Sequence, residues 1–78
     1  MGKSKRKAIL AHRKVIGEAI RRYRKRADFT QEKLAEKVAL NPKYVGELER
    51  GEKIISIEAL LRVAKAVKVP IREFFRGI

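Results

Sequence analysis

The sequence predicts an all-α protein, a compact five-helix bundle that forms a single domain. Apolar residues recur at spacings of three and four along most of the chain, which is the period of an amphipathic helix. The composition is rich in Ala and aliphatic residues and holds only 5 Gly and 2 Pro in 78 residues. A chain of this length has room for one small core, and it has no Cys for a disulfide, so we expect oligomerisation to stabilise it.

The first helix is expected to begin near Ala8 or Lys14 and to end at Arg26. The evidence is a stripe of apolar residues at helical spacing, formed by Ile16, Ala19, Ile20 and Tyr23. Residues 1–7 are basic and lack apolar periodicity, so we expect a flexible basic arm there. The folded domain is then expected to span residues 8–78.

Two short helices are predicted next, over residues 31–38 and 42–50. Their start and stop signals are Thr30, Asn41, Pro42 and Gly51. Thr and Asn side chains cap free helix amides, Pro is favoured at the first helical position, and Gly ends helices in a left-handed conformation. Because only about three residues separate the helices, they must cross steeply, which is the geometry of a DNA-binding helix-turn-helix.

A fourth helix is expected to start after the capping residue Ser56 and to end at Lys68. The side chains expected on one face are Ile57, Leu60, Leu61, Ala64 and Val67. Pro70 disfavours continuation through the residue before it, so a short fifth helix is predicted over residues 70–76.

About 60 residues resemble the lambda-repressor-like, Xre-type helix-turn-helix family. The matching segments are Ile16-Gly17-Glu18, Thr30-Gln31-Glu32-x-Leu34-Ala35, Tyr44-Val45, Leu48-Glu49-Arg50-Gly51 and Ser56-Ile57-x-x-Leu60-Leu61. The stretch from Asn41 to Val45 is similar to controller proteins of restriction–modification systems. The resemblance implies a sequence-specific DNA-binding transcriptional regulator that places its second helix-turn-helix helix in the major groove.

In this family the start of the recognition helix touches base edges. The resemblance therefore implies base contacts from Asn41, Pro42, Lys43 and Glu47. Their chemistry fits, because Asn pairs with adenine, Lys donates to guanine, Glu accepts from cytosine, and an apolar ring suits a thymine methyl. Asn41 also has a competing role as the helix cap.

Backbone phosphates are expected to contact Gln31, Tyr44, Arg50 and Lys53. The resemblance implies the Gln31 contact at a helix N-terminus, where free amides favour anions. Tyr44 has two interpretations, a hydroxyl on a phosphate or a ring packed against the preceding helix.

The family also implies a structural ion pair between Arg24 and Glu49, which would hold the recognition helix from behind. The sequence departs from the family pattern at Ala39, where glycine is common in the turn, and at Ile54-Ile55, where polar residues or proline are usual. One of these isoleucines is expected to close over the core and the other to lie at a subunit interface. Glu52 also stands where the family often has a basic residue.

A homodimer is predicted because the C-terminal part carries more apolar side chains than a small core needs. The residues assigned to the interface are Ile55, Ile71, Phe74 and Phe75. A two-fold dimer would place two recognition helices about 34 Å apart, which is one turn of DNA.

The net charge of +12 is concentrated in residues 1–26, which hold 11 Lys and Arg against one acidic residue. Such a field favours a polyanion, and we expect double-stranded DNA. No residues suit catalysis, metal ligation or cofactor binding, so a non-enzyme is expected, without a small-molecule effector. No stretch resembles a signal peptide or membrane span, and a cytoplasmic location is expected.

Two alternatives remain open. The chain suits an antitoxin that binds its own promoter and neutralises a toxin through another surface. It also suits non-specific binding to nucleic acid or a membrane through its basic N-terminal third.

Overall fold

The structure is a computed structural model that describes residues 3–78, with side chains from Lys5 onward. Its elements in chain order are α1 (Lys3–Arg26), α2 (Gln31–Val38), α3 (Pro42–Glu49), α4 (Ile57–Val67) and the 3-10 helix η1 (Ile71–Phe75). No strand occurs within residues 3–78, so the all-α prediction is confirmed. The predicted fifth helix is a short 3-10 helix, so the bundle contains four α-helices and η1 across that range.

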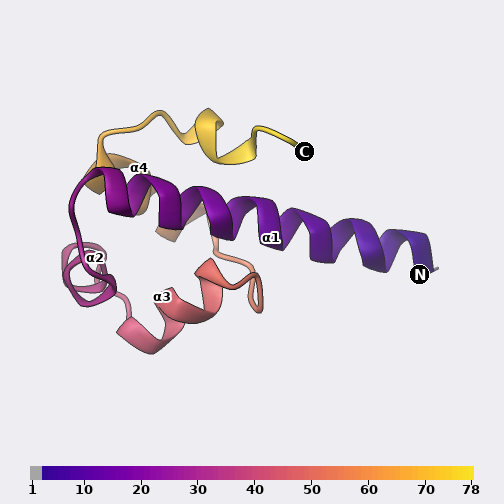
Figure 1. Ribbon diagram of the computed structural model, residues 1–78, viewed down its shortest axis with the longest axis horizontal. Helices are drawn as coiled ribbons and strands as arrows, with labels where there is room; N and C mark the ends of the chain where they lie inside the picture. Colours follow the sequence, from indigo (N-terminus) through magenta and orange to yellow (C-terminus); the bar gives the residue numbers. More distant parts are fainter. Residues whose placement is uncertain (1–2) are drawn as a thin grey trace.

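Helix α1 is the central element of the fold. It runs along the longest dimension of the molecule, which extends over 38 Å, and it packs against α3, α4 and η1. Figure 1 shows α2 and α3 on one side of α1, and η1 with the C-terminus on the other. Helix α3 therefore rests directly on the longest element of the protein.

The core lies between the second half of α1 and the other elements. Its largest fully buried side chains are Phe74, Ile20, Leu34, Leu60, Val38, Val45 and Val63. The ring of Phe74 meets that of Tyr23 edge to face, with centroids 5.2 Å apart. This contact brings the C-terminal η1 onto α1 and closes the core.

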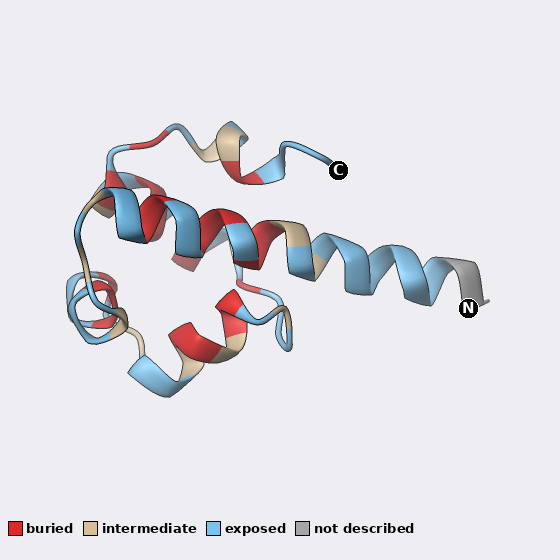
Figure 2. Cartoon of the chain, in the orientation of Figure 1, coloured by how far each residue is buried: buried red, intermediate tan, exposed pale blue. Residues whose placement is uncertain are grey.

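Helix α1 begins at Lys3, not near Ala8, which corrects the predicted start. Residues 3–7, expected as a flexible arm, continue the helix, whereas Met1 and Gly2 lie outside the described residues. Every residue from 5 to 12 is exposed, and Figure 2 shows this part of α1 extending beyond the bundle. Half of the longest helix thus lies outside the core.

The buried face of α4 also differs from the predicted one. Its buried residues are Ala59, Leu60, Val63, Ala64 and Val67. Ile57 and Leu61 are instead 61% and 50% exposed. These two side chains lie one turn apart and form an apolar strip on the outer face of α4.

Candidate nucleic-acid interface

The turn between α2 and α3 is short, and the amides of Ala39 and Leu40 both donate to the Ala35 carbonyl. Ala39 adopts a left-handed conformation with φ of 57°, and the amide of Leu40 donates to the Ala35 carbonyl at 2.9 Å. The Asn41 side chain then caps α3, because its Oδ1 accepts from the Lys43 amide at 2.8 Å. The predicted turn is therefore present, with an alanine in the position that favours glycine.

The start of α3 presents three neighbouring side chains to solvent. Asn41, Pro42 and Lys43 are all exposed, and Glu47 is half-buried one turn further along. The four residues expected to contact bases thus belong to the N-cap and first two turns of the same short helix. Asn41 already uses Oδ1 for the cap, so its Nδ2 donors remain for another partner.

The opposite end of α3 is fixed through Glu49. Arg24 of α1 donates from Nε to Oε2 of Glu49 at 2.6 Å and from Nη2 to Oε1 at 3.1 Å, and both residues are buried. Arg24 Nη1 also donates to the Phe29 carbonyl at 2.7 Å. The expected ion pair is therefore a two-point contact that also holds the α1–α2 connection.

Gln31 joins the same network, which the sequence analysis did not foresee. Its Nε2 donates to Oε1 of Glu49 at 3.0 Å, so one carboxylate links α1, α2 and α3. The second hydrogen on Nε2 remains for a phosphate at the N-terminus of α2. No sequence signal marks this contact, because the two residues lie 18 positions apart.

Gly17 permits α1 and α3 to approach closely. A Cβ at this position would clash with the main-chain carbonyl oxygen of Leu48 and lie 3.0 Å from that of Glu49. Glycine in the middle of a helix costs about 0.5–1 kcal/mol relative to alanine. An isolated glycine within a helical pattern was the available signal for this contact.

The loop after α3 holds the remaining candidates. The Tyr44 hydroxyl donates to the Ile54 carbonyl at 3.4 Å and its ring packs against the core, so both of its groups have partners. Arg50 donates from Nε to Glu52 at 2.6 Å, and Lys53 is exposed. The hydrogen bond with Arg50 lowers the pKa of the Glu52 carboxyl, and the same bond raises the pKa of Arg50.

Two of the residues assigned to a dimer interface belong to the protomer core. Ile55 is 7% exposed and Phe74 is fully buried, so neither is available to a partner. Ile71 is half-buried against the core, and Phe75 is 36% exposed. Ile54, the neighbour of Ile55, is 51% exposed and takes the outward position.

Over residues 3–78, no helix is long and apolar enough to cross a membrane. In the same part of the chain, no three His, Asp or Glu side chains gather as a metal site requires.

The helix-turn-helix geometry agrees with comparisons to known proteins. A family profile described as Helix-turn-helix matches residues 20–74, which include α2, α3 and α4. The chain belongs to this family. Its members of Xre type are DNA-binding transcription regulators, and the controller-protein resemblance seen in the sequence is confirmed by the relatives described next.

Two sequence relatives of this helix-turn-helix protein are informative. The control protein C.SmaI of Serratia marcescens is 32% identical over 59 residues, covering 76% of this chain and 70% of that protein. An uncharacterized transcriptional regulator in the ATPase CF(0) region of Rhodospirillum rubrum is 35% identical over 63 residues, covering 81% of this chain and 58% of that protein.

Solved structures share the fold. The restriction-modification controller protein C.AhdI of Aeromonas hydrophila superposes with a TM-score of 0.79 at 34% identity, covering 83% of this chain and 98% of that one. The clp gene regulator ClgR of Corynebacterium glutamicum gives 0.78 at 35% identity, covering 81% of this chain and 67% of that one.

Proposed function

We propose that this protein is a sequence-specific transcriptional regulator that binds an inverted-repeat operator as a homodimer. The observation that supports this most is the contrast between the two ends of α3. Asn41, Pro42 and Lys43 are exposed at its start, whereas Glu49 is fixed to α1 and α2 at its end. A short helix held from behind with a free polar start suits insertion into the major groove.

Base reading is assigned to four side chains. Lys43 donates to the O6 and N7 of guanine, Glu47 accepts from the N4 of cytosine, and Pro42 packs on a thymine methyl. Asn41 contributes a donor from Nδ2, because its Oδ1 stays on the helix cap. Each good bidentate pair in a major groove discriminates by about 1–3 kcal/mol.

Phosphate contacts fix the register of the protein on the duplex. We assign them to Gln31, Arg50 and Lys53, all on the half-buried or exposed rim around α3. Tyr44 contributes once its hydroxyl exchanges the Ile54 carbonyl for a phosphate oxygen.

The dimer is assigned to the apolar outer surface of α4 and the preceding loop. Its residues are Ile54, Ile57 and Leu61, each at least half exposed in the protomer. Half-sites one DNA turn apart require the recognition helices of such a dimer to lie about 34 Å apart. The likeness to C.SmaI and C.AhdI supports a controller of a restriction–modification system as the regulatory setting.

The test is selection from random duplex DNA with the purified protein, near physiological salt and with excess unrelated competitor. We expect an enriched inverted repeat whose half-sites are about one helical turn apart. In a second selection, Lys43→Ala should relax the preference at one position of each half-site. Tight binding without any enriched motif would overturn the proposal.

A further inference from the structure

The exposed half of α1 has a charge pattern that the proposed function does not use. We call residues 5–14 the α1 extension. Its basic residues are Lys5, Arg6, Lys7, Arg13 and Lys14, and it contains no acidic residue. Positions 5–12 are exposed throughout, and Figure 2 shows this part of the helix extending beyond the bundle.

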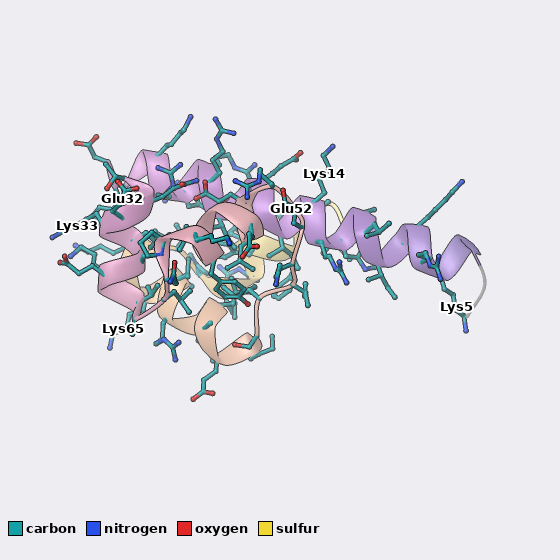
Figure 3. The ribbon with its side chains drawn as sticks, turned by 90° about the horizontal axis from the view of Figure 1, so that it is seen from below. Lys5, Lys14, Glu32, Lys33, Glu52 and Lys65 are labelled. Carbon is teal, nitrogen blue, oxygen red and sulfur yellow. The ribbon has the colours of Figure 1, made fainter. Side chains whose placement is uncertain are left out.

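The basic side chains gather on one side of the helix. Arg6 and Arg13 are seven residues apart, as are Lys7 and Lys14, so each pair is stacked over two turns. Lys5 lies nine residues from Lys14, which places it about 180° from Lys14, but it is only about 80° from Arg13, so it borders this basic side. Figure 3 shows Lys14 and Lys5 pointing in opposite directions from α1.

This basic side adjoins the loop that follows α3. A Cβ at Gly51 would lie 3.0 Å from the Cα of Lys14, so the loop backbone rests directly on α1 at this point. In Figure 3, Lys14 lies beside the loop that carries Glu52, on the same upper side as Glu32 near the start of α2. The basic side therefore continues the surface assigned to phosphate contacts.

The segment fits DNA better than a membrane or a second copy. Its apolar residues, Ala8 to Ala11, are consecutive and so surround the helix instead of forming the apolar face that membrane binding needs. Pairing with the same helix of another copy would bring like charges together. Phosphates complement the charge, and the length from Arg6 to Lys14 is about 12 Å, or about three phosphates along one strand.

We infer that the α1 extension is a second DNA-contacting element, which binds backbone phosphates adjacent to those contacted by the α3–α4 loop. It rests on the proposed DNA binding and adds affinity without reading bases. The contacting side chains are Arg6, Lys7 and Lys14, with Arg13 beside them.

The test compares two variants with equal loss of charge. One is R6Q/K7Q/K14Q, which removes the basic side. The control is K65Q/K68Q/R72Q, whose exposed residues lie on α4, at its C-cap and on η1. Arg13 is left unchanged because its half-buried side chain contributes to packing. Binding to the selected operator and to a scrambled duplex is measured by anisotropy over a series of KCl concentrations.

We expect R6Q/K7Q/K14Q to reduce the slope of log K against log salt by about 2–3 on both duplexes, with an unchanged specificity ratio. The control should change the slope by less than about 1. Hydroxyl-radical footprinting should show protection lost at a few sugars in the first variant only. Equal changes of slope in both variants would overturn the inference, because they would mean that DNA affinity depends on the total positive charge and not on the α1 extension.

The outcomes separate this inference from the proposed function. If wild-type protein does not discriminate the operator from the scrambled duplex, the proposed function fails, while the slope comparison still tests the extension. If R6Q/K7Q/K14Q keeps full DNA affinity but loses binding to phosphatidylglycerol vesicles, the extension is a membrane element and the inference is wrong.

Discussion

At the residue scale, Glu49 is the side chain that joins α3 to both α1 and α2. Its carboxylate accepts from Arg24 and Gln31, and it is almost completely buried. A buried pair of this kind is weak evidence for net stability, because both charges lost their hydration. Its value here is orientation, since it fixes the end of α3 to two other helices.

Arg24→Ala should destabilise the protein by about 3–5 kcal/mol, because it leaves the Glu49 carboxylate buried without its cation. Thermal or urea unfolding followed by circular dichroism measures this loss. The double variant R24M/E49L removes both charges at similar volume and should lose less. A loss below about 1 kcal/mol for Arg24→Ala would mean that the pair behaves like a surface ion pair.

Glu52 restrains Arg50, which we assign to a phosphate contact. It holds Arg50 in an exposed ion pair and adds a negative charge to the loop. Glu52→Gln should therefore tighten binding and steepen the slope of log K against log salt by up to about 0.9. The matched control is Glu36→Gln, which breaks another exposed pair, with Lys33, and should change the slope less. Weaker DNA binding by Glu52→Gln would contradict this assignment.

The same Glu52 carboxyl predicts a pH effect. Its pKa is lowered by the Arg50 hydrogen bond, so the ion pair is complete at neutral pH and persists to a pH below the usual carboxyl pKa. As the pH falls through the lowered pKa, Glu52 is neutralised and Arg50 is released. The DNA affinity of wild-type protein should then rise relative to that of Glu52→Gln, as measured by anisotropy in matched buffers.

At the element scale, α2 and α4 end with non-glycine residues in the left-handed region. Ala39 has φ of 57° and Lys68 has φ of 60°, while Gly51 follows α3 with φ of 75°. A left-handed residue with a Cβ costs about 1–2 kcal/mol. The helix-turn-helix thus contains a strained turn at the position where the family favours glycine.

Ala39→Gly should stabilise the protein by about 0.5–1 kcal/mol, because relief of the left-handed strain exceeds the added flexibility of the unfolded chain. Lys68→Gly should give a similar gain far from α3 and serves as the comparison. Both are measured by urea unfolding. A loss of stability in Ala39→Gly would show that the turn needs the alanine side chain.

Local signals predicted element boundaries where capping chemistry exists. The side chains of Thr30, Asn41 and Ser56 all cap helices as expected. The predicted start of α1 was wrong because the first turn of the helix has no acidic residue and no apolar periodicity. A helical segment that projects beyond the core needs no apolar stripe. Apolar periodicity in the sequence therefore indicates which part of a helix is buried, not how long the helix is.

At the scale of the whole molecule, the sequence indicated that one of two neighbouring isoleucines would enter the core, but not which one. Ile54 and Ile55 are chemically identical neighbours, yet only Ile55 enters the core. Phe74 packs against Tyr23, which no local pattern indicates. These choices depend on how the loop and η1 fold back over α1, which is a property of tertiary packing.

The outward apolar residues predict the assembly. The double variant I57E/L61E should remain folded, because both side chains are exposed in the protomer. It should sediment as a monomer, whereas we expect the wild type to sediment as a dimer. Its affinity for the full inverted repeat should fall toward that for one half-site. Ile78→Glu, at a residue 54% exposed, is the matched control and should remain dimeric.

Because one half of α1 is packed in the bundle and the other half is exposed, the amides of the two halves should differ in their protection against hydrogen exchange. Amides after Ile16 are covered by packing and should exchange only when the whole domain opens. Amides from Arg6 to Leu10 have only the helix itself and should exchange far sooner, at a rate set by local fraying. A single continuous helix would then report global unfolding at one end and helix–coil fluctuation at the other.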